Sequence, residues 1–158
     1  MTQQPSPAFP DGSPDELEMY LSWLAFLRGA VLRKAGGLTD EQARWRPDGK
    51  LLPLVGLVNH LTGVETRWID GRMLGAEVDE PADEFRPDLP IAAAIAAYRE
   101  RAAATDAAVR AIADLGTPSR YGHDTDLRWV LVHLINETAR HAGHADAVRE
   151  LLDGTVGE

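Results

Sequence analysis

Apolar residues recur along most of the chain at the three- and four-residue spacing that is typical of amphipathic helices. The pattern predicts a first helix that Ser13 caps and that stops at Gly36, followed by one or two helical turns that Thr39 caps. Three further long helices are predicted over about residues 53–74, 90–115 and 127–153. No segment has the alternation of Val, Ile and Thr that indicates a strand. We therefore expect an all-α fold, a bundle of four long helices.

Two polar connections and an N-terminal tail interrupt the helical pattern. Residues 76–89 are polar, carry prolines and are too many for a tight turn, and residues 116–126 form a second loop. Residues 1–12 hold three prolines and few large apolar groups, so we expect a disordered tail there. Residues 13–158 are expected to fold as one domain, because a chain of 158 residues can bury a sizeable core.

Charge and composition exclude several classes of function. A net charge of −9 and a pI near 5.0 argue against nucleic-acid binding, because phosphates would be repelled. The chain has no cysteine, so any thiol chemistry must use a thiol from outside. No apolar stretch approaches the roughly 20 residues that cross a bilayer, and no basic residue precedes Arg28 as in a signal peptide. We expect no membrane partner and a cytoplasmic location.

The last predicted helix carries a polar stripe on a face that should point inward. Steps of 100° per residue place His133, Glu137, His141 and His144 within about 80° of one another, between apolar residues. Unpaired imidazoles and carboxylates cost several kcal/mol when they are buried. Two interpretations are open. The stripe is a hydrogen-bonded polar layer or a solvated helix face, or it is part of a metal site.

His60 favours the metal interpretation. It flanks the apolar face of the second long helix and is expected to point into the bundle, and facing helices that offer inward ligands build metal sites in such folds. The predicted ligands are His60, Glu137 and His141. Two nitrogens and one oxygen suit Zn²⁺; Ni²⁺ and Co²⁺ fit as well, and Fe²⁺ ranks lower because nothing else indicates dioxygen chemistry. Three ligands leave a coordination position open, as catalytic zinc requires.

Several nearby residues have competing interpretations. His144 is a fourth ligand, a proton carrier, or a solvated side chain near the helix end. His133 is expected to brace the polar layer by a hydrogen bond, and Glu65 to form a salt bridge. Gly143, inside a helix, indicates either the close approach of another group or tight packing. Candidate anchors for an anionic substrate are Arg128 and Arg140.

Three segments resemble the DinB-like superfamily: LTDEQARWRPDGK, LVGLVNHLTGVETRWIDGRMLG and LRWVLVHLINETARHAGHADAVRELLDG. The resemblance covers about residues 15–154, is closest to an actinobacterial branch of small proteins, and is most specific at the string ETARHAGH. It implies a four-helix bundle with long crossover connections. It also implies a metal triad of one histidine from the second helix and two ligands four residues apart on the last helix. His60, Glu137 and His141 occupy those places.

The resemblance also implies a chemistry. Many members carry histidine where this chain has Glu137, and the His-Glu-His set is similar to that of the mycothiol-dependent maleylpyruvate isomerases, which bind zinc. The chain has no counterpart of their extra C-terminal domain, which argues against that particular reaction. Other members are thiol S-transferases that use bacillithiol or mycothiol. With 14 arginines against 2 lysines, the coding is GC-rich, which favours mycothiol.

These features predict a metal-dependent transferase. The metal would lower the pKa of a small thiol, mycothiol, whose thiolate attacks a small electrophile while His144 moves the released proton. One rival hypothesis is a non-catalytic bundle that binds a metal or forms a homodimer; dimers are common in such bundles, although no exposed stripe specifies an interface. A second rival is a hydrolase or isomerase in which the metal activates water. A fourth protein ligand would close the site and favour a structural role.

Overall fold

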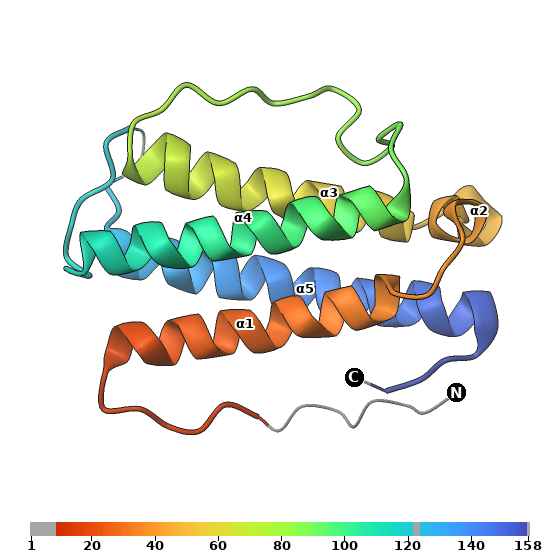
Figure 1. Ribbon diagram of the computed structural model, residues 1–158, viewed down its shortest axis with the longest axis horizontal. Coiled ribbons are helices and arrows are strands. Elements are labelled where there is room, and N and C mark those ends of the chain that lie inside the picture. Colours follow the sequence, from red (N-terminus) through yellow and green to blue (C-terminus); the bar gives the residue numbers. More distant parts are fainter. Residues whose placement is uncertain (1–8, 122–123, 158) are drawn as a thin grey trace.

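In the computed structural model, which describes residues 9–121 and 124–157, four long helices lie side by side (Figure 1). They are α1 (Glu16–Ala35), α3 (Leu54–Glu65) with its π-helical continuation η2 (Thr66–Met73), α4 (Ile91–Ile112) and α5 (Leu127–Asp153). The short helices α2 (Asp40–Arg44) and η1 (Pro47–Gly49) lie at one end of the bundle. None of the helices in these ranges combines the length and the apolar character needed to cross a membrane. The predicted all-α bundle is confirmed.

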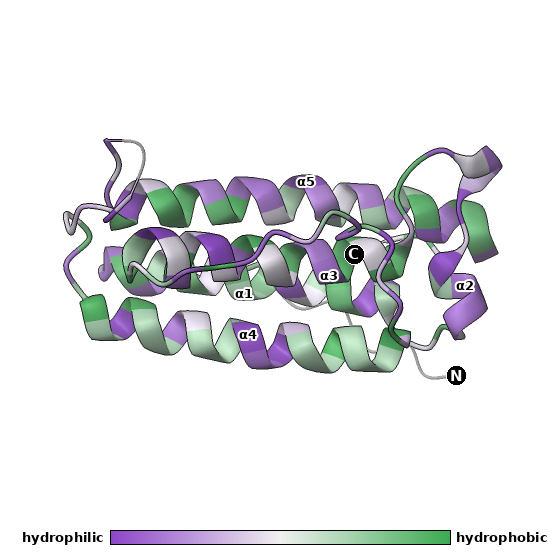
Figure 2. Cartoon of the chain, turned by 90° about the horizontal axis from the view of Figure 1, so that it is seen from above, coloured by the Kyte–Doolittle hydropathy of each residue, from purple (hydrophilic) through white to green (hydrophobic). Residues whose placement is uncertain are grey.

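The connections determine how the helices run. α1 and α5 run in one direction, and α3 and α4 run in the other (Figure 1). Because α3 and α4 are parallel, the chain between them, residues 74–90, must return along the bundle, and Figure 2 shows it lying lengthwise over α3. We call this segment the crossover. The α4–α5 connection is a turn at one end, where an isolated bridge joins Pro118 and Asp126; the described residues form no strand.

Local capping chemistry determines where the helices begin and end. The carboxylate of Asp15 accepts hydrogen bonds from two N–H groups in the first turn of α1 and so caps that helix. The prediction of Ser13 as the cap is wrong by two residues, because its hydroxyl instead accepts the N–H of Asp15. Thr39 caps α2 as predicted, within a reciprocal capping box. α5 ends as predicted at Gly154, whose φ of 75° suits glycine.

An ion pair crosses the core on one side of α3. Arg28 of α1 donates two hydrogen bonds to Glu65, of 2.8 and 2.7 Å, and one of 2.8 Å to Asp106 of α4. Burial alone would lower the pKa of Arg28, but the two carboxylates raise it. Arg28 and Glu65 are 4% and 1% exposed, so each requires the other as a partner. The predicted salt bridge of Glu65 is confirmed.

The second long helix does not keep a single winding. From Thr66 to Met73 it is π-helical, and the N–H of Leu74 donates to the carbonyl of Ile69, five residues earlier, at 2.9 Å. Ile69 and Met73 are both buried in an apolar cluster that includes Leu127 of α5. The sequence predicts the extent of this helix correctly, but it does not predict the π-helical winding. Such π segments often lie at functional sites.

The segment before α1 contacts that helix. Of the tail predicted over residues 1–12, residues 1–8 lie outside the described part of the chain. The ring centroid of Phe9 lies 5.1 Å from that of Phe26 and 6.0 Å from that of Trp23. These contacts bring the chain against α1 just before the helix begins.

Candidate metal centre

Three side chains with metal-ligand atoms meet inside the bundle. His60 comes from α3, and Glu137 and His141 come from successive turns of α5, where a spacing of four places them on one face. One ligand atom of each lies within 4.8 Å of the other two. Oε1 of Glu137 is 3.1 Å from Nε2 of His60 and 3.2 Å from Nε2 of His141. Among the described residues, this group could hold a metal ion, and it consists of the three predicted ligands.

A carboxylate from the crossover fixes the orientation of the His60 ring. Oε2 of Glu84 lies 2.8 Å from Nδ1 of His60, while Oε1 accepts a hydrogen bond from Arg67 at 2.6 Å. Because an ionised carboxylate only accepts hydrogen bonds, Nδ1 carries the proton. When His60 is neutral, Nε2 therefore carries a lone pair and no proton. This lone pair faces Oε1 of Glu137, which is also a hydrogen-bond acceptor. A carboxylate that holds one ring nitrogen and leaves the other free is the usual support of a histidine ligand.

Electrostatics favour ionised carboxylates and a neutral His141. Burial alone would raise the pKa of Glu84, but hydrogen bonds from Arg67 and His60 hold the pKa below its usual value. Burial also opposes ionisation of Glu137, but protons on the facing nitrogens of His60 and His141, when present, favour its ionised form, and its pKa lies below the usual value. Burial lowers the pKa of His141 and so favours its neutral ring. These are the protonation states in which such side chains bind a metal.

Two glycines of α3 allow the crossover to come this close. A Cβ at Gly63 would lie within 3.0 Å of Oε1 of Glu84, and a Cβ at Gly56 within 3.0 Å of the carbonyl oxygen of Phe85. A larger residue at Gly56 would displace the crossover backbone, and one at Gly63 would move the carboxylate of Glu84. The ring of Phe85 lies over the ring of His60, with centroids 4.4 Å apart. The crossover thus covers one side of the candidate ligand group.

His144 lies beside the ligand group and not within it. Its ring is nearly parallel to that of His141, with centroids 6.3 Å apart. Its Nε2 accepts a long hydrogen bond of 3.4 Å from the N–H of Leu52, which precedes α3. Burial lowers the pKa of His144 and so favours the neutral ring at pH 7.

Two predictions for α5 are wrong. His133 makes no hydrogen bond to the polar layer in the described structure; its ring contacts the indoles of Trp68 and Trp129, with centroids 4.4 and 5.3 Å away. Gly143 is exposed, and no other heavy atom of the described residues lies within 4 Å of the position of a Cβ there. Neither a close approach nor tight packing therefore requires this glycine.

The two predicted anion anchors lie outside this group. Arg128 pairs with Glu16 of α1 at 2.8 Å, on the surface. Arg140 is exposed on α5 and forms no ion pair within residues 9–121 and 124–157. Neither side chain contacts the candidate ligands in the described structure.

Sequence reasoning missed the contributions of the crossover, Glu84 and Phe85. Glu84 follows His60 by 24 residues and belongs to a polar loop, where a carboxylate attracts no notice. The available signal is the pair Gly56 and Gly63, which lie two turns apart on the otherwise apolar α3. Such a pair indicates that another segment crosses the helix closely, but it does not identify the segment.

A comparison with protein families bears on this site. The model of a family described as Mycothiol-S-transferase matches residues 19–154, a range that includes all three candidate ligands. The chain belongs to the Mycothiol-S-transferase family. This is a DinB-like family, so the resemblance stated above is confirmed. Membership supports a transferase role with a thiol substrate.

One solved structure shows the same fold as this Mycothiol-S-transferase family member. It is described as a conserved protein of locus from Enterococcus faecalis, and it superposes with a TM-score of 0.63. The match covers 90% of this chain and 100% of the other, with 13% sequence identity. At this identity the likeness concerns the fold alone. No match was found among curated proteins.

We expect alanine at Gly56 and at Gly143 to change stability in opposite directions. A methyl group at Gly56 meets the backbone of Phe85, so the free energy of unfolding should fall by about 1–3 kcal/mol. A methyl group at Gly143 meets nothing, and alanine is the better helix former, so the free energy should rise by about 0.5–1 kcal/mol. Urea unfolding followed by circular dichroism measures both. Equal changes in the free energy of unfolding for the two variants would show that the crossover is not held against α3 at Gly56.

Proposed function

We propose that this member of the Mycothiol-S-transferase family transfers mycothiol to a small electrophile with the help of a divalent metal ion, Zn²⁺ before Ni²⁺. His60, Glu137 and His141 are its proposed ligands. The observation that carries the proposal is the meeting of two imidazole nitrogens and one carboxylate oxygen within 4.8 Å, in a bundle of this family. Two histidines and one glutamate are a known ligand set of catalytic zinc.

The residues fit a cation on two further grounds. When His60 is neutral, its Nε2 and Oε1 of Glu137 are two acceptors that face each other at 3.1 Å, and a cation between them removes their repulsion. The group also contains three protein ligands and not four, since Nε2 of His144 is directed to Leu52. Three ligands leave a position for a substrate atom, as in catalytic zinc sites.

The proposed transfer joins the sulfur of the thiol to a carbon of the electrophile. A divalent metal held by these residues would lower the pKa of a bound thiol and so supply a thiolate at neutral pH. The new carbon–sulfur bond forms as the bond to the leaving group breaks, and the leaving group departs with that electron pair. The thiol proton passes to solvent by way of His144, whose ring is neutral and lies beside His141. Because the chain has no cysteine, mycothiol supplies the sulfur.

Zinc binding should depend on Glu84 as well as on the ligands. After zinc loading, we expect about one tightly bound zinc per wild-type chain and none in His60→Ala. Glu84→Gln removes the charged acceptor at Nδ1 of His60, so the affinity should fall by about 10- to 100-fold. Glu77→Gln is the matched control, because this exposed side chain of the same crossover forms no ion pair with the described residues. Competition with a chromophoric chelator measures the affinities; equal values for Glu84→Gln and the control would contradict the proposed support.

Turnover separates the proposed role of His144 from that of a fourth ligand. With zinc bound, the wild type should convert mycothiol and 4-(chloromethyl)benzamide into a thioether and chloride, measured by chromatography. His144→Gln can still accept the Leu52 N–H but cannot carry a proton, so the rate should fall by about 100-fold while zinc remains bound. Loss of zinc in His144→Gln would identify a fourth ligand. Full turnover by zinc-free His60→Ala would refute metal-dependent transfer.

A further inference from the structure

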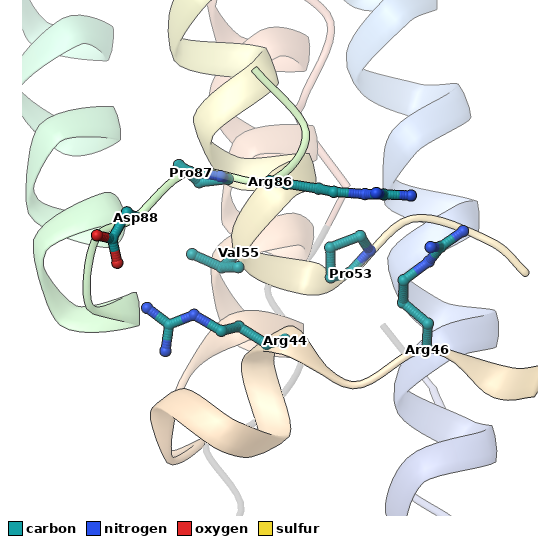
Figure 3. Close-up of a pocket in the computed structure, with 7 residues that line it drawn as sticks. All are labelled: Arg44, Arg46, Pro53, Val55, Arg86, Pro87 and Asp88. Carbon is teal, nitrogen blue, oxygen red and sulfur yellow. The ribbon is translucent and has the colours of Figure 1, made fainter. Parts of the chain in front are cut away.

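An arginine-lined pocket lies beside the candidate metal centre. It has a volume of about 310 Å³, and Arg44 from α2, Arg46 from the following turn and Arg86 from the crossover all line it. Figure 3 shows the ends of Arg46 and Arg86 on the side toward α5, and the end of Arg44 on the opposite side, toward Asp88. Two parts of the chain that lie far apart in the sequence, residues 44–46 and the crossover, thus contribute guanidinium groups to the lining of one pocket.

These guanidinium groups retain unused hydrogen-bond donors. Arg46 donates through Nε to the carbonyl of Leu51, and Arg44 donates to the carbonyls of Asp40 and Leu89. None of the three arginines of the pocket forms an ion pair with a carboxylate of the described residues, including Asp88. Elsewhere in this acidic chain carboxylates do pair with arginines, namely Arg28, Arg67, Arg101, Arg110, Arg128 and Arg149.

The charge of the pocket therefore favours an anion. Three guanidinium groups against the single carboxylate of Asp88 give a local positive charge on a chain with a net charge of −9. Pro53, where α3 begins, also lines the pocket, and no side chain caps that helix end. The positive end of the helix dipole adds to the field of the arginines. Guanidinium groups bind planar oxygen anions such as carboxylates through paired hydrogen bonds.

Chain connectivity places this pocket next to the candidate ligands. Arg86 directly follows Phe85, whose ring lies over the ring of His60. On the other side, Pro53 directly follows Leu52, whose N–H donates to His144. Two residues that line the pocket are thus the chain neighbours of Phe85 and Leu52, which contact two histidines of the site.

We propose that the pocket binds an anionic oxygen group, a carboxylate or a phosphate, on the electrophile that the enzyme modifies. This inference rests on the proposed transferase function and names the class of its second substrate. Mycothiol carries neither a carboxylate nor a phosphate, so the anion belongs to the electrophile. Arg46 and Arg86 hold the anionic end, and the reacting carbon points to the ligand group. The sulfur bonds to that carbon, the leaving group departs with its electron pair, and the anionic group is unchanged.

The test compares electrophiles that differ only in a remote charge. We compare kcat/KM of the zinc-loaded protein for 4-(chloromethyl)benzoate and 4-(chloromethyl)benzamide, each divided by its uncatalysed rate. The benzoate should be favoured by about tenfold in the wild type, and the preference should weaken with added salt. In the double variant Arg46→Ala/Arg86→Ala the ratio should approach one, because kcat/KM for the benzoate falls more than kcat/KM for the benzamide. Arg99→Ala, an exposed arginine of α4 outside the pocket, should keep the wild-type ratio.

The outcomes separate this inference from the proposed function. Turnover of both compounds at equal corrected rates in the wild type would overturn the anion site and leave the transferase function standing. If neither compound reacts, the proposed function fails, and calorimetric titration with unreactive 4-methylbenzoate then decides the pocket. Binding that the double variant loses supports an anion site; no binding to the wild type overturns it. A larger preference for 4-(chloromethyl)phenylphosphonate than for the benzoate would assign the anion to the phosphate class.

Discussion

The hydrogen bond between Glu84 and Nδ1 of His60 connects the crossover to the candidate metal centre. It orients the ring so that Nε2 faces Glu137 and His141 of α5. It also requires the crossover to lie in contact with α3. Gly56 and Gly63 permit that contact, because a side chain at either position would collide with the crossover. Because α3 and α4 are parallel, the chain needs the crossover to connect them. The same crossover therefore also orients His60, a proposed ligand.

The buried charges of α3 are divided between two faces. Glu65 pairs with Arg28 on one face, while His60 points to α5 on another. The ion pair fixes α3 against α1 and, through Asp106, against α4. A helix held in this way cannot rotate freely, which keeps the ligand atoms from the two helices at a constant separation. The N-terminal end of the same helix lines the arginine pocket, so one helix links the core, the proposed metal site and the proposed anion site.

How far the sequence predicts this structure depends on how local each feature is. Helix extents and most caps depend on neighbouring residues, and helical periodicity alone brings His60 to the face that meets α5. The pairing of Glu84 with His60 spans 24 residues and depends on where the crossover lies, which no periodicity reveals. For the same reason the sequence draws attention to Gly143, where a Cβ would meet no other described residue, although it is Gly56 and Gly63 that lie against the crossover. The π-helical turns escape prediction because over two turns their apolar pattern resembles that of an α-helix.

Zinc K-edge X-ray absorption of the zinc-loaded protein, with and without mycothiol, tests the proposed centre most directly. Without thiol we expect nitrogen and oxygen neighbours only, at about 2.0–2.2 Å, including the imidazole scattering of two histidines. Addition of mycothiol should introduce one sulfur neighbour at about 2.3 Å. A zinc shell that stays free of sulfur at saturating mycothiol, or that already contains a third histidine, would contradict a metal centre with an open position for the thiol.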